Sequence, residues 1–153
     1  LHLLREGMSV EDVDSLLNKR SAMKGLTGDN DLRQVHAAAA TGDAHAVEAL
    51  EVYVHAIRHY VGAYLAELGG ADALVFTAGV GENDAAVREA VCAGLAPLGI
   101  AIDAGKNAST RGPNEVVNLT ARGAPVQVLV VPTNEELEIA TQSLASVRSS
   151  AIE

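Results

Sequence analysis

The sequence has few aromatic side chains, a single cysteine and no long apolar run. It contains no Trp, and aromatic residues make up 3% of its 153 residues, so Ala, Val, Leu and Ile must build any core. Cys92 alone can form neither an internal disulfide nor a cysteine-based zinc site. No apolar segment reaches bilayer-spanning length and no signal peptide is visible, so we expect a cytoplasmic protein without membrane contact.

Basic residues are also scarce: 11 Lys and Arg stand against 20 Asp and Glu, which gives a formal net charge of −9. A chain this acidic is repelled by phosphate backbones, so no nucleic-acid partner is expected. The shortage of aromatics also removes the stacking surfaces that single-stranded nucleic acids need. A small anion such as ATP can still bind, because backbone N–H groups and a metal ion act locally.

Hydrophobic residues make up 48% of the chain, which suits a globular domain. The first part predicts helices at residues 9–20, 31–40 and 43–68, with Ser9 as the first N-cap and a loop at residues 24–30. In the longest helix, apolar residues recur at steps of three and four and predict one buried face: Val47, Leu50, Val54, Ile57, Val61, Tyr64 and Leu68.

The second part predicts strands in alternation with helices. The expected strands cover residues 73–77, 100–103, 116–119 and 126–131, the expected helices residues 83–95 and 134–147, and a polar loop residues 106–114. The first strand is apolar throughout, which predicts burial on both faces. We therefore predict one α/β domain over residues 1–153, mainly helical in residues 1–70 and built of strand–helix units in residues 71–150.

The segment from Thr77 to Asn83 is the first candidate site, because it joins a predicted strand to a predicted helix through Gly79, Val80 and Gly81. Glycines there let a ligand approach the backbone, and a helix start offers N–H groups to an anion. A tight turn that binds nothing explains the segment equally well. No Lys-Ser/Thr pair follows, which excludes a Walker A loop.

A dinucleotide-binding fingerprint fits the same segment in part. Gly79 and Gly81 match its first two glycines, but Asp84 occupies the third glycine position. Asp103 lies at a suitable distance downstream to meet a ribose. A dinucleotide-binding domain that uses Gly79, Gly81 and Asp103 is therefore the main alternative from another functional class.

The second candidate site runs from Val131 to Glu136. Pro132 ends a strand, and Thr133 with Glu136 three residues later predicts a capping box. Glu135 has no such explanation and could hold Mg²⁺ beside nucleotide phosphates through a hard oxygen ligand. A surface acid favoured by the helix dipole is the simpler interpretation of Glu135 from its spacing alone.

The third candidate site is Asp29–Asn30–Asp31–Leu32–Arg33. An arginine can pair with phosphate or stack on a base, and an aspartate can accept hydrogen bonds from a ribose or an adenine amine. An N-capped helix start with a solvated charge pair explains the same residues and is favoured without further information.

Together and in this order, these segments resemble the carboxyl-terminal half of the acetate kinase family. The resemblance is carried by GLTGDNDLR from Gly25, ADALVFTAGVGEN from Ala71, GLAPLGIAIDAGKN from Gly94 and VVPTNEELEIA from Val130. It covers essentially the whole chain. It departs from the family at Val80, where Ile is usual, and at Ser21-Ala22, where Ser-Gly is usual.

The resemblance implies the ATPase fold shared by actin, Hsp70 and sugar kinases, with a ribonuclease H-like α/β core. It implies that Asp31, Leu32 and Arg33 line an adenosine pocket, that Gly79, Val80, Gly81, Glu82 and Asn83 wrap the nucleotide, and that Glu135 is associated with Mg²⁺. The implied reaction is reversible phosphoryl transfer from ATP to acetate, giving acetyl phosphate and ADP, in a homodimer. Propionate kinase of the same family is a close alternative.

The family's amino-terminal Asn-x-Gly-Ser segment and central His-Leu-Gly loop do not occur in this sequence. The family's catalytic residues at the acetyl group belong to those regions, so the resemblance assigns no catalytic residue to this chain. The start at Leu1 also suggests a fragment or processed product. Because phosphoryl transfer needs donors and cations around the moving phosphate, we expect the chain alone to be inactive.

Overall fold

The computed structural model describes residues 1–150, apart from the side chains of residues 135–137, 145, 146 and 148–150. The chain divides into two compact units, Leu1–Tyr64 and Leu65–Glu153, which are described separately below. Among the residues described, no helix has both the length and the apolar character that crossing a membrane requires.

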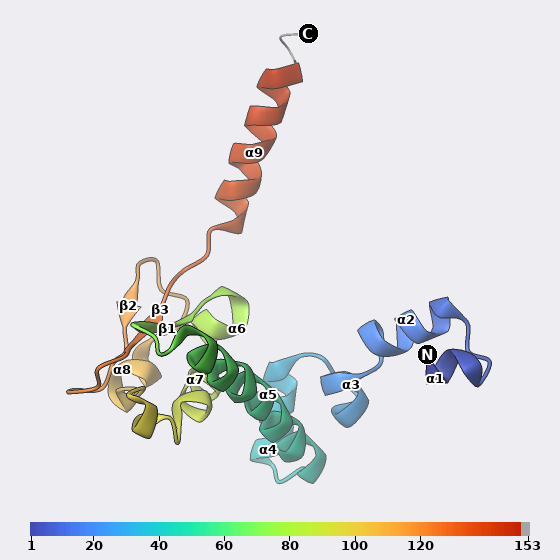
Figure 1. Ribbon diagram of the computed structural model, residues 1–153, viewed down its shortest axis with the longest axis horizontal. Coiled ribbons are helices and arrows are strands. Elements are labelled where there is room, and N and C mark those ends of the chain that lie inside the picture. The colour runs from blue at the N-terminus through green and yellow to red at the C-terminus, as the bar shows by residue number, and fades with distance from the viewer. Residues whose placement is uncertain (151–153) are drawn as a thin grey trace. The chain divides into compact units, whose positions relative to one another are not determined.

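The first unit is helical throughout (Figure 1). Its elements are α1 (His2–Arg5), α2 (Val10–Lys19), α3 (Ala22–Thr27), α4 (Leu32–Ala40) and α5 (Ala44–Leu68), the last of which runs on into the second unit. The Ser9 hydroxyl caps α2 by accepting the Asp12 N–H at 3.1 Å, as predicted. The three predicted helices are thus confirmed within one or two residues.

Helix α3 lies where the sequence predicted a loop at residues 24–30. Gly28 ends this helix in the left-handed conformation (φ 80°), and its N–H donates to the Lys24 carbonyl at 2.9 Å. The loop prediction counted the glycines of Lys24–Asn30 as breakers. One of them, Gly28, instead forms the end of a short helix, where glycine is the favoured residue.

The buried face of α5 differs from the predicted stripe. Ala46 and Ala49 are 2% and 1% exposed, whereas Tyr64 and Leu68 of the predicted stripe are 62% and 73% exposed. Spacing correctly indicated a helix, but its buried residues are two small alanines rather than the larger apolar residues. The larger apolar residues at the end of α5 therefore leave an uncovered surface in the structure described.

The second unit combines a small mixed sheet with short helices. Its elements are β1 (Ala73–Phe76), α6 (Ala78–Asn83), α7 (Ala85–Cys92), the 3-10 turn η1 (Ala96–Leu98), α8 (Ala104–Ser109), β2 (Val117–Asn118), β3 (Gln127–Val130) and α9 (Glu135–Ser150). The strand order is β1-β3-β2: β3 pairs parallel with β1, Ala73 opposite Gln127, and antiparallel with β2. The predicted α/β character and the edge strand are confirmed.

Aliphatic side chains form the core of this unit, as the low aromatic content requires. The buried apolar residues include Phe76, Val87, Val91, Cys92, Leu95, Ile100, Leu119, Val126, Val128 and Val130. Strand β3 lies at the centre of the sheet, and Val128 and Val130 have no exposed surface. Strand β1 lies at the edge, and Val75 is 48% exposed, so the predicted burial of both its faces is wrong for the described chain.

Three local predictions need correction. Gly79–Val80–Gly81 lies inside helix α6 rather than in a turn. The predicted strand at residues 100–103 forms only isolated bridges, from Ile100 and Ile102. The predicted loop at residues 106–114 begins in helix α8, because the Asp103 carboxylate accepts the Lys106 N–H at 3.0 Å and caps this helix.

The second unit contains a guanidinium with no exposed surface, that of Arg88 on α7. Its Nε donates to the Asn107 side-chain oxygen at 2.8 Å, and its Nη2 donates to the carbonyls of Asn107 and Thr110 at 3.1 and 2.7 Å. Its Nη1 donates to the Gly81 carbonyl at 2.9 Å. One side chain therefore joins α6, α7 and α8.

Replacing Arg88 should destabilise the fold strongly. Arg88→Met keeps much of the side-chain volume but leaves buried carbonyls without donors, so we expect a loss of about 2–4 kcal/mol in the free energy of unfolding. The neighbouring Glu89→Ala change removes an exposed charge from the same helix and should alter stability by no more than about 0.5 kcal/mol. Urea denaturation of the two variants measures the difference, and equal midpoints would contradict the structural role of Arg88.

Candidate functional site

The first candidate segment begins where β1 ends. The Thr77 hydroxyl donates to the Val131 carbonyl at 2.8 Å and makes no capping bond to α6. Ala78 follows with φ 57°, a left-handed conformation that costs a non-glycine residue about 1–2 kcal/mol. The bond from Thr77 to Val131 joins the ends of the parallel strands β1 and β3, so the two chain segments that leave them lie next to each other.

The two glycines of α6 have different surroundings. A Cβ on Gly81 would lie 3.0 Å from the carbonyl carbon and 3.3 Å from the Cα of Phe76, which is tighter than most Cβ contacts and would require the backbone to shift slightly. A Cβ on Gly79 would meet nothing within 4 Å. Packing against β1 therefore explains the glycine at position 81, whereas the space beside Gly79 is open.

Glu82 and Asn83 complete the segment with contacts inside and outside α6. The Asn83 side-chain amide donates to the Gly79 carbonyl at 2.9 Å. One carboxylate oxygen of Glu82, Oε1, accepts both the backbone N–H and the hydroxyl of Thr133, each at 2.8 Å. These bonds from the Thr133 backbone, and then from its hydroxyl, lower the pKa of Glu82. The carboxylate thereby joins the first candidate segment to the second.

Arg88 holds the same segment from the core side through the Gly81 carbonyl. Burial lowers the pKa of the Arg88 guanidinium, and the nearby charge of Asp84 opposes that effect. The role of this residue is not evident from the sequence, because one charge in an otherwise amphipathic helix is ordinary. A signal was nevertheless present: Arg88 precedes Cys92 by four residues, on the face that the apolar pattern assigns to the core.

In the second candidate segment, the backbone donor expected for the capping box has another acceptor. Helix α9 begins at Glu135, so its third residue is Leu137 rather than Glu136. The Thr133 N–H that Glu136 was expected to accept is donated to Glu82 instead. The side chains of Glu135 and Glu136 lie outside the described residues, and the role of Glu135 in metal binding stays a prediction. Within the described residues, no group of three or more His, Cys, Asp or Glu is arranged to hold a metal ion.

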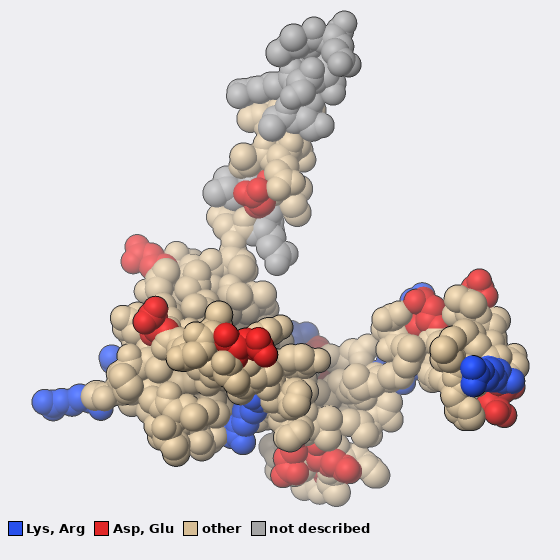
Figure 2. All heavy atoms as spheres, viewed as in Figure 1, with Lys and Arg blue, Asp and Glu red and all other residues tan. Residues whose placement is uncertain are grey.

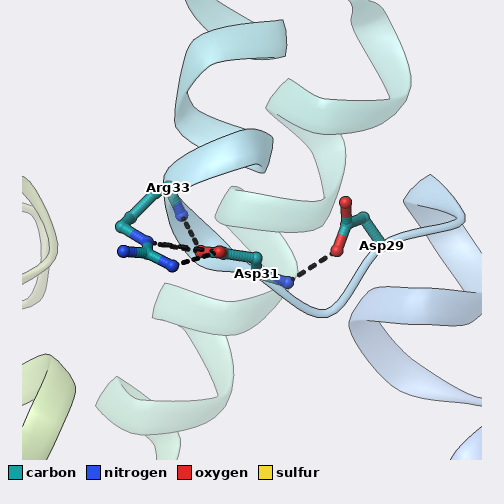
Figure 3. A network of polar contacts seen from close by, with 3 residues as sticks. All are labelled: Asp29, Asp31 and Arg33. Carbon is teal, nitrogen blue, oxygen red and sulfur yellow. Dashed lines mark hydrogen bonds and ion pairs between the residues drawn. The ribbon is translucent and has the colours of Figure 1, made fainter.

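The third candidate segment lies in the first unit and forms a compact polar turn (Figure 3). Asp31 caps α4 by accepting the Arg33 N–H at 3.0 Å, and its carboxylate also receives the Arg33 guanidinium, with Nη2 at 2.6 Å and Nε at 2.9 Å. The Asp29 carboxylate accepts the Asp31 N–H at 2.8 Å. Leu32 is half-buried at the start of the helix.

These contacts stabilise the charged form of Asp31. Bonds from the Arg33 side chain, and then from its backbone N–H, lower the pKa of Asp31 from 3.8 to about 2. Because the folded-state pKa is the lower one, the contribution to stability is complete above the ordinary value and is lost as the pH falls through about 2. The pair is exposed, so salt screens it.

A hollow of about 260 Å³ lies beside this turn in the first unit. Its walls come from α3, α4 and α5 and the turns between them: Thr27, Asp29, Gln34, Val35, Ala38, Asp43 and Ala46. Asp29 and Gln34 flank the predicted residues Asp31, Leu32 and Arg33, which do not line the hollow themselves. Gln34 is not among the residues predicted for the site, although it follows Arg33 directly.

The dinucleotide-binding alternative loses its structural basis. Gly79 and Gly81 lie within a helix instead of the tight turn that the fingerprint requires. The Asp103 carboxylate, which was expected to meet a ribose, caps α8. Neither group has the arrangement that this class of site needs.

Comparison with known proteins places all three candidate segments within one family match. Residues 2–141 match the acetokinase family. The chain is 54% identical over 143 residues to the acetate kinase of Leifsonia xyli subsp. xyli, a match that covers 94% of this chain and 36% of that protein.

Solved structures give the same result. The acetate kinase of Porphyromonas gingivalis superposes with a TM-score of 0.83 at 38% identity, over 94% of this chain and 36% of that one. A propionate kinase from Francisella tularensis superposes with a TM-score of 0.77 at 38% identity, over 88% and 34% of the two chains.

The fold is therefore that of the ATPases related to actin, Hsp70 and sugar kinases. Within that class, the chain belongs to the acetokinase family. It spans about a third of the length of the relatives that it matches.

Alanine substitutions at the two glycines of α6 should have opposite consequences. Gly81→Ala forces a contact with the Phe76 backbone and should cost about 1–3 kcal/mol of stability. Gly79→Ala meets open space in a helix and should leave stability unchanged or raise it by up to about 1 kcal/mol. If a nucleotide approaches Gly79, the same change should weaken ADP binding about tenfold, which corresponds to about 1.4 kcal/mol.

Thermal melts and ADP titrations of both variants provide the measurement. A Gly79→Ala variant with unchanged ADP affinity would exclude close approach of the nucleotide at this position. A Gly81→Ala variant as stable as the parent would show that packing against Phe76 does not require glycine.

Proposed function

We propose that the chain is the carboxyl-terminal, nucleotide-binding part of an acetate kinase, an enzyme that transfers the ATP γ-phosphoryl group reversibly to acetate. The observation that carries the proposal is the acetokinase match over residues 2–141, which includes the Asp31–Arg33 and Gly79–Asn83 segments and Glu135. Relatives about 50% identical to the chain over nearly its whole length are named acetate kinases.

In this proposal, Asp31, Leu32 and Arg33 bind the adenosine part of ATP. The Arg33 side chain is 83% exposed, while its guanidinium is held by bonds to both carboxylate oxygens of Asp31. A guanidinium fixed in this way keeps a flat face available for stacking on a base. The half-buried Leu32 beside it supplies apolar surface, and Asp31 orients the arginine.

Gly79, Val80, Gly81, Glu82 and Asn83 provide the segment that wraps the nucleotide. The open space beside Gly79 suits backbone approach by a ligand. The Asn83 side chain donates a hydrogen bond to the Gly79 carbonyl within the short helix, and the buried Arg88 guanidinium donates one to the Gly81 carbonyl. A segment held in this way loses little further freedom when a ligand binds, which favours affinity.

Glu135 is the residue we propose for association with Mg²⁺. Mg²⁺ keeps several waters and usually binds through one or two carboxylates together with substrate phosphates, so a cluster of protein ligands is not required. When bound, Mg²⁺ offsets the negative charge of the phosphates. Glu135 opens α9 two residues after Thr133, which Glu82 holds, so its backbone starts from a fixed point.

The acyl acceptor, the oligomeric state and the compartment are inferred from the family. A propionate kinase superposes on this chain nearly as well as an acetate kinase, so propionate is the second candidate acceptor. The residues that distinguish the two acyl groups would lie in the part of the enzyme beyond this sequence. A cytoplasmic homodimer is the assembly we propose, without nucleic-acid or membrane partners.

Nucleotide selectivity tests this assignment directly. We expect the chain to bind ADP in the presence of Mg²⁺, and NAD⁺ in excess not to displace it, because the dinucleotide fingerprint is not formed. Isothermal titration with ADP, repeated with NAD⁺ present, gives the answer. Displacement of ADP by NAD⁺ would favour the dinucleotide-binding class. The full-length enzyme should form acetyl phosphate from ATP and acetate, and the chain alone should not.

The adjacent acids Glu135 and Glu136 should differ in function. Consecutive helical residues point about 100° apart, so the two carboxylates cannot easily share one role. In the full-length enzyme, Glu135→Ala should lower kcat by roughly 10–100-fold and raise the Mg²⁺ concentration for half-maximal rate. Glu136→Ala is the matched control and should change neither value greatly, since the Thr133 N–H that it was expected to accept is donated to Glu82.

Rates measured over a Mg²⁺ titration, with thermal melts alongside, separate the two residues. A Glu135→Ala enzyme with the parent rate and Mg²⁺ dependence would remove Glu135 from the metal site. Loss of activity in Glu136→Ala at an unchanged melting temperature would reverse the assignment.

A further inference from the structure

Glu82 makes contacts that its position in a nucleotide-wrapping segment does not explain. Its side chain is half-buried, and its Oε1 accepts two hydrogen bonds from one residue, Thr133, that lies 51 positions later in the chain. Its backbone carbonyl accepts the N–H of Gly112 at 3.1 Å. Three segments of the second unit thus meet at this one glutamate.

Its partner Thr133 lies in the short connection between strand β3 and helix α9. It follows the central strand β3 by three residues and precedes Glu135, the first residue of α9, by two. Both of its hydrogen-bond donors, the backbone N–H and the hydroxyl, go to the same carboxylate oxygen. A residue held through backbone and side chain at once has little freedom to rotate, so the chain leaves it in a defined direction.

The other side of Glu82 is equally fixed. The Gly81 carbonyl accepts a hydrogen bond from the buried Arg88 guanidinium, which also donates to Asn107 and Thr110. Glu82 therefore directly follows a residue that is hydrogen-bonded to the buried Arg88. Its carboxylate joins this part of α6 to Thr133.

We propose that Glu82 is a positioning residue that holds the start of α9, and with it Glu135, against the nucleotide-wrapping segment. The inference rests on the proposed function for the meaning of Glu135, but the contact with Thr133 is independent of it. In this role Glu82 acts through Thr133, whose backbone N–H and hydroxyl both donate to its Oε1.

Two pairs of substitutions test this role in the full-length enzyme. Glu82→Gln keeps an oxygen acceptor of the same reach, and Glu82→Ala removes it. Thr133→Ser keeps the hydroxyl donor, and Thr133→Val removes that donor while leaving the backbone N–H. Glu89→Gln removes one exposed negative charge from the next helix and serves as the control for charge alone.

The first readout does not depend on activity. Amide hydrogen exchange should show the Thr133 N–H protected in the parent, in Glu82→Gln and in Glu89→Gln, and much less protected in Glu82→Ala. In the ADP complex, Mn²⁺ affinity measured by electron paramagnetic resonance should fall by roughly 10-fold or more in Glu82→Ala, the scale seen when outer partners of metal sites are lost. The Mn²⁺ affinity of Thr133→Val should lie between those of the parent and Glu82→Ala, and the affinity of Thr133→Ser should match that of the parent.

The kinetic readout separates positioning from direct binding. Glu82→Ala should raise the Mg²⁺ concentration for half-maximal rate by a similar factor, while the KM for ATP at saturating Mg²⁺ changes by less than about 3-fold. A raised KM for ATP with unchanged Mn²⁺ affinity would make Glu82 a nucleotide ligand and overturn the proposal. Full protection of the Thr133 amide in Glu82→Ala would overturn it as well.

Failure of the proposed function has a different signature. In that case the parent enzyme would show neither ADP binding nor acetyl phosphate formation. The exchange measurement would still decide whether Glu82 holds Thr133.

Discussion

A guanidinium with no contact to water must have its N–H groups satisfied by the protein, and this requirement organises the second unit. Arg88 meets it with oxygens from three places: the Gly81 carbonyl, the Asn107 side chain and backbone, and the Thr110 carbonyl. Asn107 is itself buried and donates its side-chain amide to the Ala85 carbonyl at 2.8 Å. Because an unpaired buried charge is very costly, α6, α7 and α8 cannot move apart without losing this arrangement.

The aliphatic sheet gives this network a firm base. The last pair in the β1–β3 register is Phe76 with Val130, and beyond it the Val131 N–H donates to the Phe76 carbonyl at 2.9 Å. The carboxyl ends of these two parallel strands thus stay together, and the Thr77 hydroxyl donates to the Val131 carbonyl beyond them. Ligands of open α/β sheets bind at such ends. The pairing of the strands, rather than any single side chain, is what brings the two candidate segments of this unit to the same place.

The sequence was sufficient for three of the four predicted strands and for the longer helices of the first unit, because these depend on apolar spacing and on caps within a few residues. It was insufficient where distant contacts decide the structure. The first strand is apolar throughout, yet Val75 is exposed, since no other part of the described chain covers its side chain. The Thr133–Glu136 spacing indicated a capping box, but Glu82, 51 residues earlier, accepts the Thr133 N–H.

The glycine segment shows the same limit. Gly79 and Gly81 indicated a turn by composition, although the turn is made by Ala78 in a left-handed conformation, which alanine rarely adopts. The helix can begin directly afterwards because Arg88 and Asn83 bond to its carbonyls. Neither contact follows from local propensity. For Arg88, the spacing predicts a position on the buried face of α7, but it does not predict the partners of the guanidinium.

The acidic composition also has a structural explanation that bears on anion binding. Asp31, Asp43, Asp84 and Asp103 each accept a backbone N–H in the first turn of a helix, and each such cap contributes about 1 kcal/mol. On the face shown in Figure 2, the described acidic side chains lie in small separate groups rather than in one broad field. Many carboxylates therefore act against nearby N–H dipoles, and their effect at a distance is weakened by salt. The net charge of −9 is for this reason compatible with a local site for a nucleotide, whose binding depends on groups within a few ångströms.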